Sequence, residues 1–117
     1  MRIELVRDEI SLATLEEVAK EFYNFMIKGV VDIEEEIAAF GGEYHMDANM
    51  ILIGAGSKQS NIWGFNIHLH KKPGEEGWLE YTSLINIRPN QGNITMEITD
   101  PTLREKINLI LKKIVKE

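Results

Sequence analysis

Residues 62–98 alternate between apolar and polar side chains, and this alternation constrains the fold more than any other feature of the chain. Successive side chains of a β-strand point to opposite faces, so a period of two predicts strands with one apolar face. Two breaks rich in turn-forming residues, KKPGEEG and PNQG, divide the stretch. The sequence therefore predicts an antiparallel meander over residues 62–98.

The alternation assigns side chains to two faces and fixes how the strands should pair. The apolar face carries Trp63, Phe65, Ile67, Leu69, Leu79, Tyr81, Ile85 and Ile87. The polar face carries Asn66, His68, His70, Glu80, Thr82, Asn86, Arg88, Thr95 and Glu97. Matching faces across the first loop predicts that His68 lies opposite Glu80. Across the second loop, matching predicts Arg88 opposite Asn93 and Ile85 opposite Met96.

Two stretches have helical periodicity. Residues 12–28 follow a capping residue, Ser11 or Thr14, and place apolar residues from Leu15 to Met26 on one stripe, with Gly29 as a stop. Residues 101–116 follow Asp100 as a cap, with Pro101 at the first helical position. We expect both helices to pack on the apolar face of the sheet.

The remaining elements are less well determined by the sequence. Residues 2–6 alternate as a short strand. In residues 30–53, the spacing of apolar residues fits a helix, whereas the β-branched residues at its start favour strands. We expect two strands joined near residues 34–36, and a buried strand or a single helical turn over residues 50–53. The overall prediction is one α+β domain over residues 1–117, with a mostly antiparallel, twisted sheet of about four to six strands and two helices on one face.

Composition narrows the functional classes. A chain of 117 residues suits one domain, and the lack of cysteine excludes disulfides and thiolate metal sites. No segment resembles a signal peptide or is long enough to span a bilayer, so we expect a cytoplasmic protein that has no membrane partner and needs no cofactor to fold. The net charge of −6 makes nucleic acid an unexpected partner. The exception would be binding through Lys112, Lys113 and Lys116.

Candidate binding residues lie on the polar face and its loops. Arg88 flanks a tight loop whose amides could bind a carboxylate or phosphate with it. In the other interpretation these residues only form turns: Asn93 ties the loop ends together and Arg88 pairs with a surface glutamate. The candidate binding set is Asn61, Asn66, Asn86, Arg88 and Asn90.

A metal site is the second hypothesis. In a strand, His68 and His70 would lie on one side, about 7 Å apart at the backbone, and Glu80 could complete a ligand set. His45 and Asp47 have the same spacing if they are extended. No nucleophile, oxyanion donor or phosphate loop accompanies them, so the sequence identifies no catalytic residue.

Four stretches of the chain, GGEYH, GSKQSNIWGFN, SLINIRP together with QGN one residue later, and DPTLREKI, have a family resemblance. They resemble a family of small prokaryotic proteins that is catalogued only as a domain of unknown function. The resemblance covers nearly the whole chain. It implies a compact single domain and no activity, and it adds weight to Trp63, Asn66, Asn86 and Arg88 as family features.

The leading functional hypothesis is a non-catalytic binding or interaction module that uses the polar sheet face and the loops around Asn61 and Asn90. Its partner would be a protein or a small molecule, including a second copy in a homo-oligomer. The alternative is a small metal-assisted hydrolase built on His68, His70 and Glu80.

Overall fold

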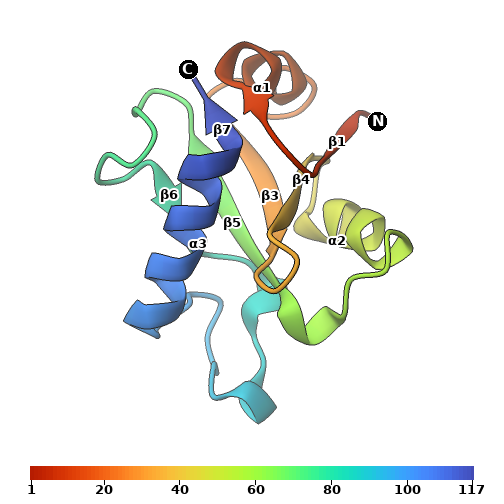
Figure 1. The fold of residues 1–117 in the computed structure, drawn as a ribbon, viewed down its shortest axis with the longest axis vertical. Coiled ribbons are helices and arrows are strands. Elements are labelled where there is room, and N and C mark those ends of the chain that lie inside the picture. The colour runs from red at the N-terminus through yellow and green to blue at the C-terminus, as the bar shows by residue number, and fades with distance from the viewer.

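A five-stranded antiparallel sheet forms the centre of the molecule (Figure 1). The computed structural model describes residues 1–117. In sheet order the strands are β1 (Ile3–Val6), β4 (Ile37–Gly41), β3 (Met26–Asp32), β5 (Ile62–His68) and β6 (Leu79–Glu80). Two further short strands, β2 (Ile10–Ser11) and β7 (Val115–Lys116), pair in parallel. The predicted α+β class and the strand near residues 2–6 are confirmed.

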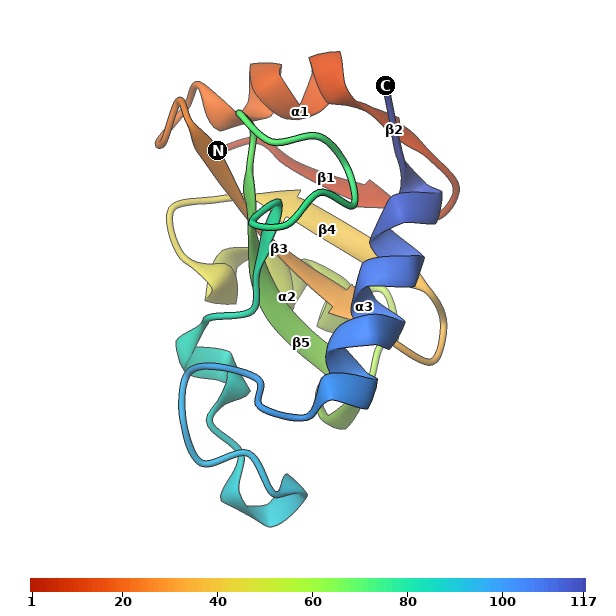
Figure 2. The same ribbon diagram turned by 90° about the vertical axis from the view of Figure 1, so that its left-hand side faces the viewer.

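Two helices, α1 (Leu12–Ala19) and α3 (Pro101–Ile114), contribute to one large hydrophobic cluster with the sheet, as predicted (Figure 2). The start of α3 follows the sequence signal, since the Asp100 side chain accepts a hydrogen bond from the Thr102 amide and Pro101 opens the helix. The cluster includes Leu15, Val18, Phe40, Trp63, Phe65, Trp78, Ile107 and Leu111.

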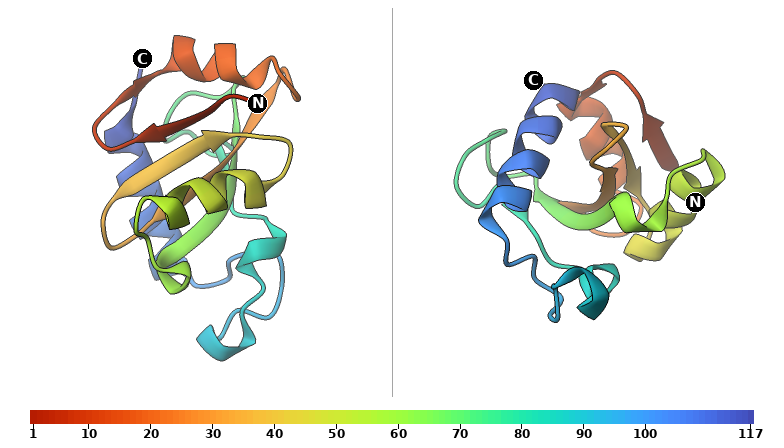
Figure 3. Two further views of the ribbon diagram at one scale, coloured as in Figure 1. Left: turned by 90° about the vertical axis from the view of Figure 1, so that its right-hand side faces the viewer. Right: turned by 60° about the horizontal axis from the view of Figure 1, so that its bottom comes forward.

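A third helix, α2 (His45–Gly54), covers the opposite face of the sheet (Figure 3). It packs on a smaller cluster that contains Val30, Ile37, Ala39, Ala48, Leu52 and Ile62. Of the two alternatives for residues 50–53, the helical turn is the correct one, but the rest of the helix was not predicted, since His45 and Asp47 are helical rather than extended. Its N-terminus is stabilised by Asp47, whose Oδ2 accepts hydrogen bonds from the amides of Glu43 and Tyr44.

The first helix is shorter than the sequence predicts. Ser11 caps α1 through a 3.1 Å hydrogen bond from the Thr14 amide, but the helix ends at Ala19 rather than near residue 28. The expected continuation of the apolar stripe is wrong, because Phe25 is exposed and β3 begins at Met26. Gly29 stops no helix. It lies inside β3, where the ring of Phe65 occupies the space that a Cβ would need.

Residues 30–53 do contain the two expected strands, the second half of β3 and all of β4, joined by a turn over residues 33–36. Asp32 stabilises this turn, because its Oδ1 accepts hydrogen bonds from the amides of Glu34 and Glu35. The buried Oδ2 of the same carboxylate accepts a 2.6 Å hydrogen bond from Ser57.

The meander is only partly formed. Between β5 and β6, Asn66 rather than the predicted His68 lies opposite Glu80. This is a shift of two residues, and an even shift leaves each side chain on its predicted face. Beyond Glu80 the chain makes isolated bridges, Thr82 to Glu97 and Arg88 to Asn93, with 3₁₀ turns between them. The predicted Arg88 pairing is confirmed, whereas Ile85 does not pair with Met96. None of the helices is long and apolar enough to cross a membrane.

Candidate functional site

Three polar residues lie side by side across neighbouring strands on the face that α2 partly covers. Lys28 on β3 is opposite Asn66 on β5, which in turn is opposite Glu80 on β6. Asn66 donates a 2.8 Å hydrogen bond from Nδ2 to Glu80 Oε1, and His68 Nε2 is 3.4 Å from the same oxygen. This end of the sheet face therefore carries a row of polar side chains, in which Glu80 contacts both Asn66 and His68.

His45, the first residue of α2, lies beside this polar row. Its Nε2 is 2.8 Å from the carbonyl oxygen of Phe65 and must donate to it, because a carbonyl only accepts. The pKa of His45 is lowered to about 4, mainly by burial and to a smaller extent by Lys28, against the opposing effects of the Phe65 carbonyl, Asn66 and Glu80. The imidazole is therefore neutral at pH 7, and its Nδ1 carries no hydrogen.

A cavity of about 470 Å³ lies between the N-terminus of α2, the sheet and residues 82–96. The side of the cavity toward the sheet is polar, and much of its rim is formed by exposed apolar side chains such as Leu84 and Met96. The residues that line it are Lys28, Tyr44, His45, Met46, Asp47, Asn66, Thr82, Ser83, Leu84, Ile85 and Met96. This arrangement of apolar walls and a few polar groups is typical of small-molecule sites.

Asn66, which lines this cavity, has one side-chain atom without a hydrogen bond. Asn66 is 6% exposed, and its Oδ1 is buried without a hydrogen bond. Exchanging the positions of Oδ1 and Nδ2 would not satisfy this atom. The Glu80 carboxylate only accepts hydrogen bonds, so the atom that contacts it must be the donor Nδ2. The indole nitrogens of Trp63 and Trp78 are also buried without a hydrogen bond, although most buried side-chain polar groups have one.

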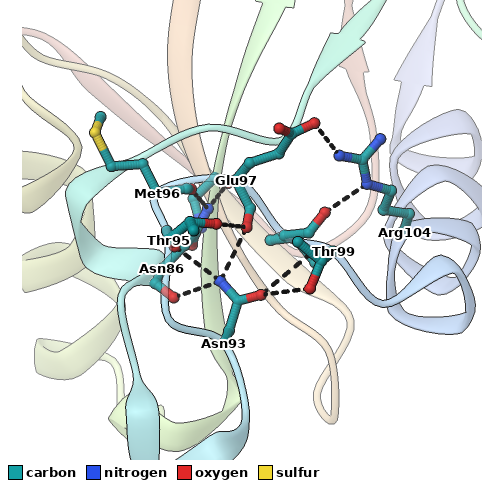
Figure 4. Close-up of polar contacts among 9 residues, drawn as sticks. Asn86, Asn93, Thr95, Met96, Glu97, Thr99 and Arg104 are labelled. Carbon is teal, nitrogen blue, oxygen red and sulfur yellow. Dashed lines mark hydrogen bonds and ion pairs between the residues drawn. The ribbon is translucent and has the colours of Figure 1, made fainter.

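Asn86, a candidate binding residue, is engaged within the fold. It is fully buried, and its side-chain amide makes two hydrogen bonds to the backbone of Gly64, accepting from N–H at 2.8 Å and donating to C=O at 2.9 Å. Asn93 ties the neighbouring loop together, as one interpretation of the sequence predicts (Figure 4). Its Nδ2 donates to the carbonyls of Asn86, Thr95 and Glu97, and its Oδ1 accepts from the amide and hydroxyl of Thr99.

The N–H groups of Arg88 are also used in hydrogen bonds within the fold. The guanidinium donates to the carbonyls of Gln59, Ile62 and Ile85, and it lies 4.3 Å from the centre of the Trp63 ring. Burial lowers the pKa of Arg88. No carboxylate pairs with Arg88, so the expected ion pair with a surface glutamate does not form.

The other candidates lie apart. Asn61 borders a second, wholly polar cavity beside Asp32 and Ser57, and Asn90 is exposed in the 3₁₀ turn Pro89–Gln91. Among the five candidate binding residues, only Asn66 lines the cavity beside α2.

The histidines do not assemble a metal centre. The His68 and His70 rings meet edge to face with their centres 6.0 Å apart. No group of three or more His, Asp or Glu side chains is arranged to hold a metal ion, and this includes the set of His68, His70 and Glu80.

Sequence reasoning missed the contribution of α2 to the site. His45 was noted only as a metal ligand in an extended segment, and Lys28 was placed in a helix rather than beside Asn66. A usable signal was Asp47, because an acidic residue in a first turn is typical of helix starts. It was weak because the cap position holds Tyr44 rather than a Ser, Thr, Asp or Asn.

Comparison with known families gives one match. A model of a protein family of unknown function, DUF5674, matches residues 4–114. The chain belongs to this family. No curated protein and no solved structure matches the chain. For this DUF5674 member, GGEYH ends at the first residue of α2 and GSKQSNIWGFN ends at Asn66, so two of the resembling stretches supply the polar side of the cavity.

Proposed function

We propose that this DUF5674 protein is a non-catalytic module that binds a small molecule in the cavity at the N-terminus of α2. The observation that carries the proposal is the cavity of about 470 Å³, whose lining combines the polar side chains of Lys28, His45 and Asn66 with exposed apolar side chains such as Leu84 and Met96.

The chemistry of the cavity supports binding rather than catalysis. With a pKa of about 4, His45 is a weak base at neutral pH, and its Nε2 is already hydrogen-bonded to the Phe65 carbonyl. Ser83 Oγ accepts a 3.3 Å hydrogen bond from the Ile85 amide, and no base is hydrogen-bonded to it. A protein partner and a homo-oligomer, which the sequence also predicts, stay predictions.

Protein-observed NMR with a fragment library tests the proposal. We expect some fragments to shift the amide resonances of residues 45–48, 66 and 82–84. Met96→Trp, which fills part of the cavity, should abolish these shifts. Ile94→Trp is the matched control, because Ile94 is exposed on the same segment but does not line the cavity. Fragments that bind only elsewhere, or that bind Met96→Trp as well as the parent, would contradict the proposed site.

The metal-assisted hydrolase is the alternative, and the contact between His68 and Glu80 supports it. If zinc binds there, a hundredfold excess over its dissociation constant should stabilise the fold by about 2.7 kcal/mol. The melting temperature of chelator-treated protein should then rise on addition of zinc, and His68→Ala should lose the rise.

A further inference from the structure

The two edges of the central sheet end differently. Beside β5 the edge is largely closed, because β6 pairs with Asn66 and Ile67 and the Asn86 side chain bonds both backbone groups of Gly64. The opposite edge is β1, which pairs with β4 alone (Figure 3). An exposed strand edge is a row of unpaired N–H and C=O groups that can pair with another chain.

The hydrogen bonds at the ends of β3 show which neighbouring strand each of its residues bonds. In an antiparallel sheet, successive residues of a strand bond alternately to the two neighbouring strands. The amide of Ile33 donates to the Asn61 carbonyl, and the amide of Leu69 donates to the Phe25 carbonyl, both on the β5 side. The odd-numbered residues of β3 therefore bond toward β5, and the even-numbered residues bond toward β4.

The same alternation extends through β4. Val30, an even-numbered residue of β3, lies opposite Ala39, so the backbone of Ala39 bonds toward β3. The next residue, Phe40, then bonds toward β1, where it lies opposite Glu4. Glu4 is therefore one of the β1 residues whose backbone groups are used within the sheet.

This pattern identifies the free backbone groups of β1. The N–H and C=O groups of Glu4 and Val6 face β4, so those of Ile3 and Leu5 point away from the sheet. No turn, loop or side chain makes a hydrogen bond to the backbone of Ile3 or Leu5. The outer side of β1 is therefore available for pairing.

The surroundings of β1 leave room for a further strand. The helix that follows β1 lies on a face of the sheet rather than at this edge, since its Leu15 and Val18 side chains belong to the large cluster. Leu5 is 37% exposed, and β1 contains no proline that would prevent pairing. An exposed apolar side chain in the middle of an open edge favours association.

The backbone pattern limits how β1 can pair with a second copy of itself. Only outward-pointing residues form hydrogen-bonded pairs, so an arrangement about a two-fold axis must match Ile3 and Leu5 with odd-numbered residues. If Ile3 lay opposite Leu5 of the second copy, Glu4 would lie opposite Glu4. Like charges directly opposite are destabilising, so this register is disfavoured.

Centring the pair on Leu5 gives a self-complementary edge. Leu5 then meets Leu5 of the second copy, which buries two exposed apolar side chains together. Glu4 lies opposite Val6, and Arg2 is brought toward Asp8, which places opposite charges at both ends of the pair. The sequence of this edge thus fits a second copy of the same chain.

We propose that two copies of this chain associate through antiparallel pairing of their β1 strands about a two-fold axis at Leu5. This pairing gives the homo-oligomer predicted from the sequence a specific interface and joins the two sheets into one. No residue of β1 lines the cavity beside α2, so the interface is independent of the proposed ligand site. Because β1 has only 4 residues, we expect a small interface and a dimer that dissociates on dilution.

Sedimentation velocity of the full chain over a wide range of concentrations tests the proposal. We expect a monomer that converts to a dimer as the concentration rises. Leu5→Lys and Leu5→Glu should each weaken the dimer by about tenfold or more, because like charges meet at the axis. An equal mixture of the two variants should form a mixed dimer, because the charges at the axis are then opposite. Ile94→Lys, at an exposed apolar residue away from β1, is the control and should dimerise as the parent does.

Amide hydrogen exchange of the parent protein, followed by NMR, tests the same interface without a variant. Exchange of the Leu5 amide should slow as the concentration rises, because this amide bonds only in the dimer. Exchange of the Glu4 amide, which already bonds β4, should not change. This comparison decides the matter even if a Leu5 variant fails to fold.

Three results would overturn the proposal. The first is a parent protein that stays monomeric at the concentrations used for NMR. The second is a dimer that Leu5→Lys does not weaken or that leaves exchange of the Leu5 amide unchanged. The third is a mixture of folded Leu5→Lys and Leu5→Glu that dimerises no better than either variant alone, which would place the axis elsewhere.

Discussion

At the scale of single residues, Arg88 connects three parts of the chain. Its guanidinium reaches the carbonyls of Gln59, Ile62 and Ile85 while its flat face lies on Trp63. These carbonyls belong to a 3₁₀ turn, the first residue of β5 and a second 3₁₀ turn. A planar group with five N–H donors can bridge such a set, whereas the single ammonium of a lysine cannot reproduce its geometry.

Arg88→Ala should therefore destabilise the fold. Losing these hydrogen bonds leaves buried carbonyls unsatisfied, and we expect the free energy of unfolding to fall by about 2–4 kcal/mol in denaturant titrations. Arg88→Lys should recover little of it. Arg7→Ala, at an exposed arginine, is the control and should change stability by less than about 0.5 kcal/mol. If Arg88→Ala kept the parental stability but lost ligand binding, Arg88 would be a ligand contact, as the sequence suggests.

His45 should make stability depend on pH. Its pKa is about 4 in the folded protein against an ordinary value of 6.5. Between pH 6.5 and pH 4 the His45 side chain is protonated in the unfolded chain but mostly neutral in the folded chain. The free energy of unfolding therefore falls as the pH drops from 6.5 toward 4, and the contribution of His45 does not change further below pH 4. The loss at pH 5 is about 2 kcal/mol.

Urea titrations at pH 7, 6, 5 and 4.5 measure this loss. His45→Gln, which has no titratable group there, should lose less stability than the parent over that range, and the difference isolates His45 from the carboxylates. His70→Gln, at an exposed histidine, should follow the parent curve. Parallel curves for the parent and His45→Gln would contradict the neutral, buried imidazole.

At the scale of elements, the segment after β6 shows why alternation alone overpredicts strands. Asn86 lies beside Gly64 and offers its side-chain amide where a neighbouring strand would offer a peptide group. The Asn86 side chain thus makes the hydrogen bonds to β5 that a neighbouring strand would otherwise make. The backbone of residues 84–86 is not needed for that pairing and forms a 3₁₀ turn. Alternation indicates which residues face the sheet, but it does not distinguish a peptide partner from an amide side chain.

Gly64→Ala tests this close approach. A Cβ at Gly64 would lie 2.6 Å from Ser83 Cβ, so the segment carrying Ser83 and Asn86 would have to move. We expect a loss of about 1–3 kcal/mol, typical of overpacking, measured by denaturant unfolding. Gly54→Ala is the matched control, because no atom lies within 4 Å of the added methyl group and helix propensity favours alanine. Equal stability of the two variants would contradict the packing described.

The first and second helices illustrate the limits of periodicity at this scale. Phe22, Phe25 and Met26 continue the helical spacing of α1. The residues from Met26 onward also fit a strand, and they form one because β3 pairs with both β4 and β5. In α2 the buried residues include the polar His45 and Asn49, so an apolar pattern could not have revealed it. Local signals gave Asp100 as the cap of α3 and Ser11 as one of two candidate caps of α1, because the side chain and the helix start are adjacent in sequence.

At the scale of the whole molecule, the predicted class, the two helices on one face and most of the central strands follow from residue patterns. The candidate site was less predictable, since it joins β3, β5, β6 and α2, and three of these depend on long-range pairing. Of the polar residues that line the cavity, Asn66 was predicted from its place on the polar face of the meander. His45 could be assigned its role only once the Phe65 carbonyl beside it was known.

The position of α3 in the large cluster has a consequence for folding during translation. Ile107, Leu111 and Ile114 cover the face of the sheet that also carries Phe65 and Trp63, yet they are synthesised more than thirty residues after β5 ends. At about 5–20 residues per second, that apolar face stays uncovered for several seconds on the ribosome. We therefore expect the nascent chain to be a substrate for chaperones that shield apolar surfaces until α3 emerges.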